Sequence, residues 1–287
     1  MPLVVTAGIL GERMSERLQD ADLSHRASAA RCETTNVRLL SIDRAAAERE
    51  IVKRPAYTQG LIFVDGELYE STGKKGHSAI YRLDTNGGPR NELNRLDKNL
   101  FGEGLSKLGD RFYQLTWRAG LAFAYSYDSE RARLTRVSTY QRDGEGWGLT
   151  SFGDELVLSD GSHRLSFIEP KTFAVNRIVS VQHAGQQIEN LNELEFARGE
   201  ILANIYGDNN IVGIDPQGGC VSTIIDASGL ISDMAADLAG VREPICGNPC
   251  SKLDFVLNGI AYDAIENELY ITGKNWPLIF VYRNLFG

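Results

Sequence analysis

The chain has 287 residues, of which 43% are hydrophobic and 24% charged, as is typical of a soluble globular protein with a sizeable core. Its formal net charge of -8 argues against a nucleic-acid binder, because such proteins carry a clustered basic face. No run of about 18 or more apolar residues occurs, so the sequence predicts no membrane span, and we expect no membrane partner. Small or neutral-to-cationic substrates fit this composition better.

The chain begins with two segments that lie outside any repeat. Residues 1–35 form a polar arm that we expect to be helical or disordered. Its apolar opening lacks a basic start and a convincing cleavage site, so it is a poor signal peptide and leaves the localisation open. Residues 36–43, NVRLLSID, have the pattern of a strand without a neighbouring partner.

Five later segments superpose and define a repeat. Each has an apolar strand, a turn at a pair such as Asp65-Gly66 or Gly109-Asp110, and a returning strand. The repeats begin at Gln59, Glu103, Trp147, Asn192 and Asn258, at intervals of 44, 44, 45 and 66 residues. A period near 44 residues, with third and fourth strands and no helix between them, is typical of four-stranded propeller blades.

The last repeat ends at Gly287, too early to contain a fourth strand. We expect residues 36–43 to supply it, because a ring closed in this way has no exposed edge. The sequence therefore predicts an all-β domain over residues 36–287, a five-bladed β-propeller closed by an N-terminal strand, with an insertion at about 226–256. A short helix in the insertion is predicted from apolar residues at helical spacing: Ile231, Met234, Ala235 and Leu238.

The chain contains four cysteines: Cys32, Cys220, Cys246 and Cys250. The CGNPC spacing of the last two suits a small disulfide loop in an oxidising compartment, and it suits two unpaired surface thiols equally well. Structural zinc would need a second ligand pair, and the histidines are scattered along the chain. We therefore expect no metal site.

The repeat predicts which residues gather at one end of the central channel. The first strand of each blade lines the channel and pairs antiparallel with the second, so the start of one and the end of the other meet at the same mouth. The inner ring there is predicted to contain Gln59, Glu103, Trp147, Asn192 and Asn258. The next ring is predicted to contain Gly73, Trp117, Gly161, Tyr206 and Gly273, with Lys274 following and with Tyr57 and Phe101 just before the strands. An acid, a cation, amides and aromatic walls in one concavity are typical of a small-molecule site.

Several of these residues also have a purely structural explanation. The glycines that follow the inner ring are expected where backbones crowd near the axis. Tryptophans of propellers commonly pack between blades, and a channel amide commonly satisfies buried backbone groups. Glu103 is harder to explain in this way, because a carboxylate in a narrow mouth is costly unless it is paired or used.

Eight short motifs, one or two in each blade, carry a family resemblance. They are YTQGL (57–61), YESTG (69–73), FGEGL (101–105), LTW (115–117), GWGLT (146–150), NELE (192–195), LNGIAYD (257–263) and TGKNWP (272–277). In this order they make residues 36–287 resemble the plant and bacterial glutaminyl-peptide cyclotransferases. That family consists of five-bladed propellers that convert N-terminal glutamine into pyroglutamate and release ammonia.

The resemblance implies a metal-free and cofactor-free enzyme, acting on peptides or proteins with N-terminal glutamine, in an extracytoplasmic location; we expect a monomer. It implies Glu103 and Lys274 as catalytic residues. It implies seven substrate-binding residues: Tyr57, Gln59, Phe101, Trp117, Trp147, Asn192 and Tyr206. Phenylalanine is common in the family at Tyr57 and tryptophan at Tyr206, so one wall of the pocket is expected to differ in shape.

The residue types suit this reaction, because the substrate supplies both the amine nucleophile and the carboxamide electrophile. Positioning and proton transfer are what remain for the protein. We expect Glu103, with a pKa raised by burial, to accept and return one proton. We expect Lys274, with the amides of Gln59 and Asn192, to stabilise the oxyanion. A propeller hydrolase or lactonase with a channel metal, and a non-enzymatic binding propeller, remain as alternatives.

Overall fold

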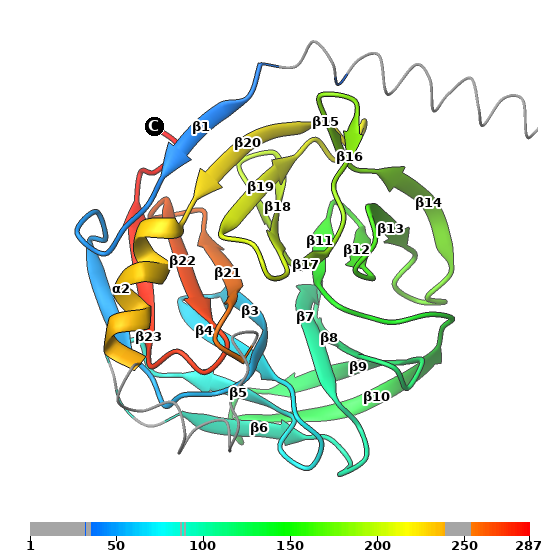
Figure 1. Cartoon of the computed structure of the whole chain (residues 1–287). Helices are drawn as coiled ribbons and strands as arrows, with labels where there is room; N and C mark the ends of the chain where they lie inside the picture. Colours follow the sequence, from blue (N-terminus) through cyan, green and yellow to red (C-terminus); the bar gives the residue numbers. More distant parts are fainter. Residues whose placement is uncertain (1–31, 33–35, 87, 89, 239–253) are drawn as a thin grey trace, which may run out of the picture.

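The structure, a computed structural model, describes residues 32, 36–86, 88, 90–238 and 254–287. Five sheets surround a central axis as the blades of a propeller, and a small hairpin of β15 (Gln182–His183) and β16 (Gln186–Gln187) lies between two of them (Figure 1). The predicted five-bladed β-propeller is confirmed. The predicted arm, residues 1–35, lies outside the described residues except for Cys32, so the proposed division at residue 36 stays a prediction.

Each blade is a meander of consecutive antiparallel strands. The first blade contains β3 (Thr58–Val64), β4 (Glu67–Thr72), β5 (Ala79–Leu83) and β6 (Asn91–Arg95). The second contains β7 (Gly102–Leu108), β8 (Arg111–Thr116), β9 (Leu121–Asp128) and β10 (Arg133–Gln141). The third contains β11 (Leu149–Phe152), β12 (Glu155–Ser159), β13 (Arg164–Ile168) and β14 (Val175–Ser180). The fourth contains β17 (Leu191–Ala197), β18 (Glu200–Ile205), β19 (Asn210–Ile214) and β20 (Val221–Asp226), and the fifth β21 (Leu257–Asp263), β22 (Glu268–Gly273) and β23 (Leu278–Arg283).

The turns between first and second strands follow from the local sequence. Asp65 and Gly66 have φ angles of 51° and 84°, and Arg198 and Gly199 have φ angles of 51° and 87°. Two successive residues in this region give a two-residue hairpin whose twist matches that of the flanking strands. These turns fix the register that brings the start of the first strand opposite the end of the second.

Apolar side chains fill the space between neighbouring blades in five separate clusters. Between the first two blades, for example, Ile62 and Ile80 pack with Leu105 and Phe112. The inner strands are buried along most of their length because a blade covers each face, whereas outer strands such as β10 are largely exposed. The core is thus a ring of interfaces around the channel.

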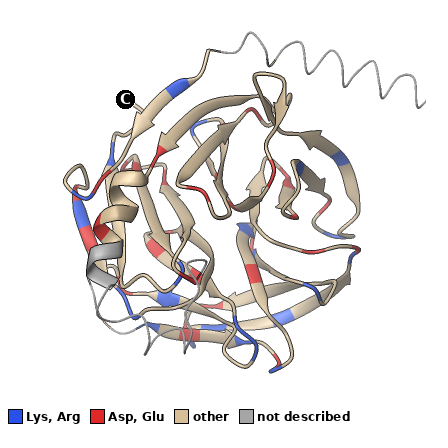
Figure 2. Ribbon diagram, viewed as in Figure 1, with Lys and Arg blue, Asp and Glu red and all other residues tan. Residues whose placement is uncertain are grey.

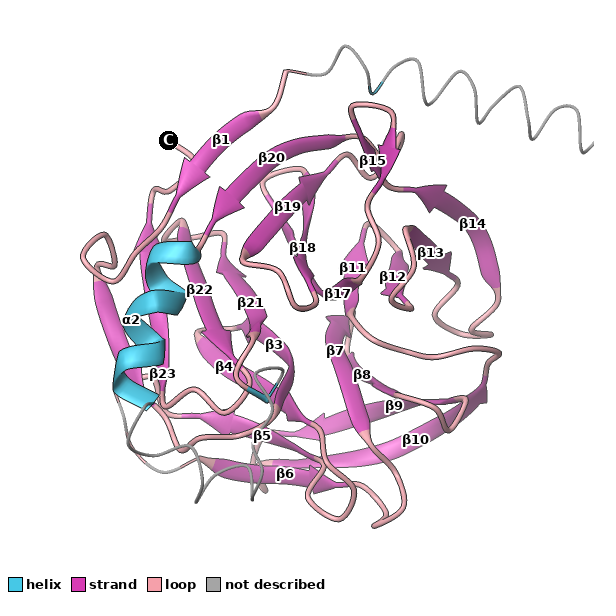
Figure 3. Cartoon of the chain, viewed as in Figure 1, coloured by secondary structure: helices cyan, strands magenta, loops and turns pink. Residues whose placement is uncertain are grey.

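Helix α2 (Ser228–Leu238) confirms the helix predicted in the insertion (Figure 3). Its residues Leu230 and Met234 are buried in the cluster between the fourth and fifth blades, and Ile231 packs against its edge. The remainder of the insertion, residues 239–253, lies outside the described residues. Within the described part of the chain, no helix combines the length and the apolar character needed to cross a membrane.

An N-terminal strand does close the ring, but the prediction that residues 36–43 supply it is wrong. Residues of β1 (Arg38–Ser41), in the predicted segment 36–43, run parallel to β20 on the fourth blade. The closing strand is β2 (Arg49–Val52), which pairs antiparallel with β23 (Figure 1). Ile51 of β2 is 2% exposed and enters the cluster between the fifth and first blades. The strand-like, apolar sequence of residues 36–43 led to their prediction as the closing strand. In the structure β2 ends only a few residues before β3 begins, so β2 is the strand that reaches the open edge of the fifth blade.

A disulfide joins Cys32 to Cys220, which are 188 residues apart in the chain. Cys220 directly precedes β20, so the bond ties the segment before β1 to the fourth blade. Nothing in the spacing of the two cysteines indicated this pair. Cys246 and Cys250 lie outside the described residues, so the two alternatives for their CGNPC segment stay open.

Candidate active site

A cavity of about 260 Å³ opens at the predicted mouth of the channel. The structure brings all nine predicted site residues to this cavity and adds Lys74. The lining comprises Tyr57, Gln59, Lys74, Phe101, Glu103, Trp117, Trp147, Asn192, Tyr206 and Lys274. Every blade contributes at least one of these residues, so the cavity exists only once the ring is closed.

A β-bulge re-aims the chain at the ring position of four blades. The pairing of first and second strands shifts between Thr58 and Gly60, between Gly102 and Leu105, between Leu191 and Leu194, and between Leu257 and Ile260. A bulge leaves one or two residues unpaired and turns their side chains. The unpaired stretches contain the ring residues Gln59, Glu103, Asn192 and Asn258, which explains why these polar side chains escape the regular alternation of the strands.

Two glycines allow the inner strands to approach closely enough to form this ring. A Cβ atom at Gly60 would lie 2.6 Å from the backbone nitrogen of Leu105, and one at Gly104 would lie 2.5 Å from that of Leu149. Such distances are far inside van der Waals contact. The crowding predicted near the axis is therefore present, and it fixes Glu103 between the first and third blades.

Glu103 is 4% exposed and is held by a relay of side-chain amides. Gln59 Nε2 donates to Glu103 Oε1 at 2.8 Å, and Asn258 Nδ2 donates to Gln59 Oε1 at 3.3 Å. Burial raises the pKa of Glu103 well above its usual range; the charge of Lys274 and the Gln59 hydrogen bond lower it in part, and the charge of Glu145 raises it further. The carboxyl group therefore holds its proton more tightly than a carboxyl group in water does.

Lys274 is the cation of the same cavity and is 3% exposed. Burial lowers the pKa of its ammonium group to about 8, although the charge of Glu103 opposes this shift. Its Nζ lies 5.0 Å from the ring centroid of Tyr57 and 4.8 Å from that of Tyr206. Tyr57 and Tyr206, at which the resemblance implied a different pocket wall, therefore both face the ammonium group of Lys274.

Glu145, which the sequence did not single out, braces the aromatic walls. Its Oε2 accepts hydrogen bonds from Trp117 Nε1 at 2.6 Å and Trp147 Nε1 at 3.0 Å, while its Oε1 accepts one from Arg118 at 2.7 Å. Burial alone would raise the pKa of Glu145, but the hydrogen bonds from these three partners lower it overall. One carboxylate thereby fixes the orientation of two indole rings that line the cavity.

Lys74 was missed by the sequence interpretation, although a signal was present. The tripeptide Thr-Gly-Lys occurs at residues 72–74 and again at 272–274, at equivalent positions of the first and fifth blades. Lys74 is exposed, its Nζ pairs with Asp254 at 3.0 Å, and it lies 4.0 Å from the ring centroid of Tyr57. Tyr57 therefore has a lysine ammonium group near its ring from each of these two blades.

Asn192 carries an unused acceptor. It is 2% exposed, and its Oδ1 has no hydrogen-bond partner among the described residues. A buried carbonyl without a partner is costly, so such an atom beside a cavity is suited to bind a donor that enters it.

Two further buried carboxyl groups lie on β17. Glu193 is fully buried, and its two oxygens accept from the backbone nitrogens of Leu61 at 3.1 Å and Ile260 at 2.9 Å. Glu195 accepts from the backbone nitrogen of Tyr262 at 3.0 Å. Burial raises the pKa of both groups, that of Glu195 to about 8. Neither residue lines the cavity.

The described residues contain no group of three or more His, Cys, Asp or Glu side chains arranged to hold a metal ion. The donor set of the cavity consists of one carboxylate, two lysines and two amides. A calcium or zinc centre of a propeller hydrolase would need several carboxylates or a histidine at one point.

The fold and the cavity together define a class: a β-propeller with a buried acid and a buried lysine in a small-molecule pocket at one mouth of its channel. The family model of glutamine cyclotransferase matches residues 21–283. The chain belongs to this family, as the resemblance of its motifs predicted.

Individual relatives agree with this assignment. The glutaminyl-peptide cyclotransferase of Arabidopsis thaliana is 34% identical over 229 residues, which are 78% of this chain and 66% of that protein. The crystal structure of Myxococcus xanthus glutaminyl cyclase is 35% identical, with a TM-score of 0.71 over 86% of this chain and 97% of the other. An aldose sugar dehydrogenase of Streptomyces coelicolor shares the fold alone, at 11% identity and a TM-score of 0.52 over 82% of this chain and 97% of that one.

Proposed function

We propose that the protein is a glutaminyl-peptide cyclotransferase, which converts the N-terminal glutamine of peptides or proteins into pyroglutamate and ammonia. The observation that carries this proposal is the buried Glu103, held by Gln59 at 2.8 Å, in the same cavity as Lys274.

In the proposed reaction, the α-amine nitrogen attacks the Cδ carbon of the γ-carboxamide. A carbon–nitrogen bond forms, the bond to the amide nitrogen breaks, and ammonia leaves. Glu103 in its carboxylate form accepts the proton that the amine loses, and as a carboxylic acid it returns a proton to the departing nitrogen. Such proton transfer contributes about 10² to 10⁴ in rate, and the raised pKa of Glu103 suits both steps.

We assign the stabilisation of the developing oxyanion to Lys274. Because the pKa of Lys274 is lowered to about 8, its ammonium group is charged below about this pH. A well-placed donor of this kind contributes about 2.7 to 4 kcal/mol. The nitrogen of Gln59 already donates to Glu103, so we assign Gln59 to holding the acid in place. The unused Oδ1 of Asn192 is suited to accept from a substrate N–H group.

We assign the aromatic residues to gripping the aliphatic part of the glutamine side chain. Phe101 lies 5.5 Å from Trp117 and 6.0 Å from Tyr57 between ring centroids, and Trp147 lies 5.7 Å from Tyr206. Holding the flexible side chain folded brings amine and carboxamide together, which can be worth roughly 10⁵ M in effective concentration. The same walls exclude water and so disfavour hydrolysis to glutamate.

We further propose an extracytoplasmic location, in which the enzyme acts as a monomer without metal or cofactor. The Cys32–Cys220 disulfide supports the location, because disulfides persist in oxidising compartments. The single-carboxylate donor set supports metal-independent catalysis.

The test is to incubate the purified protein with a Gln-initiated dipeptide and to measure ammonia together with the mass of the product. A product lighter than the substrate by one ammonia is expected. N-terminal glutamate as the product would contradict cyclisation. Loss of turnover on chelation would favour the metal-dependent alternative.

A further inference from the structure

A second concavity adjoins the mouth of the active site on the side of the first blade. It has a volume of about 780 Å³ and shares Tyr57 and Lys74 with the active-site cavity. A substrate that inserts its N-terminal glutamine must lead its following residues out through the mouth. This hollow, which we call the blade 1 groove, offers those residues a continuous path.

The blade 1 groove is cationic. Its described lining contains four basic side chains and one histidine, and no acidic side chain: Arg54, Lys74, Lys75, Arg90 and His77. Of these, Lys74 pairs with Asp254, which does not line the groove. The whole chain, in contrast, has a net charge of -8, and its acidic and basic residues are interspersed over the blades (Figure 2). Arg54 and Lys75 are exposed, and neither has an ion-pair partner among the described residues.

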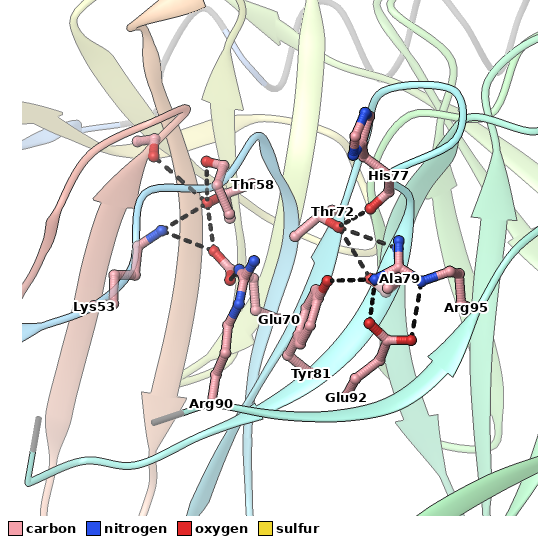
Figure 4. A network of polar contacts seen from close by, with 12 residues as sticks. Lys53, Thr58, Glu70, Thr72, His77, Ala79, Tyr81, Arg90, Glu92 and Arg95 are labelled. Atoms are coloured by element: carbon pink, nitrogen blue, oxygen red, sulfur yellow. Dashed lines mark hydrogen bonds and ion pairs between the residues drawn. The ribbon is translucent and has the colours of Figure 1, made fainter. Parts of the chain in front are cut away.

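A buried network beneath the groove leaves the charge of Arg90 uncancelled (Figure 4). Glu70 is fully buried and pairs with two cations, Lys53 Nζ at 2.8 Å and Arg90 Nη1 at 3.5 Å. The hydroxyl of Thr58 donates to the same carboxylate at 2.6 Å. One carboxylate cannot neutralise two cations, so the network is left with a net positive charge.

The position of Arg90 is fixed by more than this ion pair. Its guanidinium carbon lies 3.8 Å from the ring centroid of Tyr81. A cation held in place in this way attracts a carboxylate at a smaller cost in side-chain entropy than a freely moving lysine. The groove therefore combines one fixed cation with the exposed Arg54 and Lys75.

We propose that the blade 1 groove binds acidic side chains of the substrate segment that follows the N-terminal glutamine. The protein then prefers peptides with Asp or Glu at the second to fourth positions. An extended chain advances about 3.3 Å per residue, which brings those positions over the groove. This inference rests on the proposed cyclotransferase function.

The experiment compares two C-terminally amidated peptides, Gln-Ala-Asp-Asp-Ala and Gln-Ala-Asn-Asn-Ala, which differ in charge and hardly in shape. We expect kcat/KM to be about threefold to tenfold higher for the acidic peptide, because each exposed ion pair contributes modestly. This ratio should fall as salt is added, since salt screens exposed charges.

A double variant with a matched control identifies the groove as the source. Arg54→Ser with Lys75→Ser should lower the ratio toward one, because only the fixed Arg90 and the paired Lys74 are left in the groove. The Asn peptide reports on folding and chemistry in the same variant. Arg133→Ser with Lys171→Ser removes the same charge from exposed positions on the second and third blades and should keep the wild-type ratio.

Equal kcat/KM values for the two peptides would overturn the proposal, as would a ratio that survives the Arg54 and Lys75 substitutions. A preference for a free C-terminal carboxylate over its amide, without any Asp-to-Asn difference, would also overturn it. Failure of the cyclotransferase function itself would look different, because then no glutamine peptide would give a pyroglutamate product.

Discussion

Two regions of the channel contain buried carboxyl groups with raised pKa values, and their surroundings differ. At the mouth, Glu103 lies beside an open cavity, with a side-chain amide and a lysine as neighbours. Deeper in the ring, Glu193 accepts backbone N–H groups from the first and fifth blades and joins them to the fourth. Burial and a shifted pKa are common to both, so they do not identify the catalytic acid. The hydrogen-bond partners and surroundings of each carboxyl group do identify it. Backbone donors fix the carboxylate of Glu193 in place, whereas the cavity leaves Glu103 free to exchange a proton.

The largest effect that tests this comparison is expected for Glu103→Gln. The amide keeps the shape of the side chain but cannot transfer the proton, so kcat should fall by about 10² to 10⁴ with an unchanged melting temperature. Turnover by the ammonia assay and thermal unfolding of the same sample measure both quantities.

Glu193→Gln is the matched control for that substitution. Its new NH₂ group would face the backbone N–H of Leu61 or Ile260, so we expect a loss of about 1 to 3 kcal/mol in unfolding free energy. Its kcat should stay near the wild-type value while the protein is folded. Reversed outcomes for Glu103 and Glu193 would show that the two carboxyl groups have been assigned the wrong roles.

Lys274→Ala is expected to have the next largest effect, a decrease of about 10² to 10³ in kcat with little change in KM, because it removes the oxyanion donor. The pKa of about 8 also predicts that wild-type kcat declines as pH rises through this value and Lys274 loses its charge. Lys274→Arg keeps the charge and should lose this decline. A full rate in Lys274→Ala would mean that the oxyanion is stabilised elsewhere.

Glu145→Gln should have a smaller effect that separates binding from chemistry. Weaker support for Trp117 and Trp147 should raise KM about threefold to tenfold. Removal of the negative charge also lowers the pKa of Glu103, so the acid limb of the pH–rate profile should move to lower pH. Glu189→Gln removes an exposed acid elsewhere and is the control; an identical profile for both variants would contradict this role of Glu145.

The smallest effect is expected for the pH dependence of stability, and it tests Glu195, a buried carboxyl group that lies outside the cavity. The folded-state pKa of Glu195, about 8, lies above that of an unfolded glutamate, so the folded state holds this proton more tightly. Its stabilising contribution is complete below the unfolded pKa and is lost as pH rises to about 8. We expect Glu195→Gln to reduce this pH-dependent loss, measured by denaturant unfolding at several pH values. An unchanged pH dependence would contradict the shift.

Much of the fold and the site could be predicted, because the repeat has a short period and a regular chemistry. The Asp65-Gly66 turn and the 44-residue interval are local features, and they place Gln59 and Glu103 at equivalent positions of neighbouring blades. Glu145 could not be predicted in this way. It lies in a connecting segment outside the repeat. Its role in the site comes from hydrogen bonds with the indole nitrogens of two tryptophans, and one of these, Trp117, is 28 residues away in the chain.

The same distinction explains the error at the ring closure. Local sequence favours residues 36–43 as a strand, and they do form β1, but local sequence cannot say which sheet edge a strand will meet. The Cys32–Cys220 bond is a similar case, since 188 residues separate its two sulfurs and only the folded chain brings them together.

The sequence by itself determined the five-bladed architecture, the mouth at which the polar residues gather, and the family, because all three depend on patterns within one repeat length. Only the tertiary structure decided which N-terminal strand closes the ring, how Glu145 orients the two indole rings of the cavity, and where the cationic groove lies. Those features arise from contacts between blades, which are physical neighbours without being neighbours in the chain.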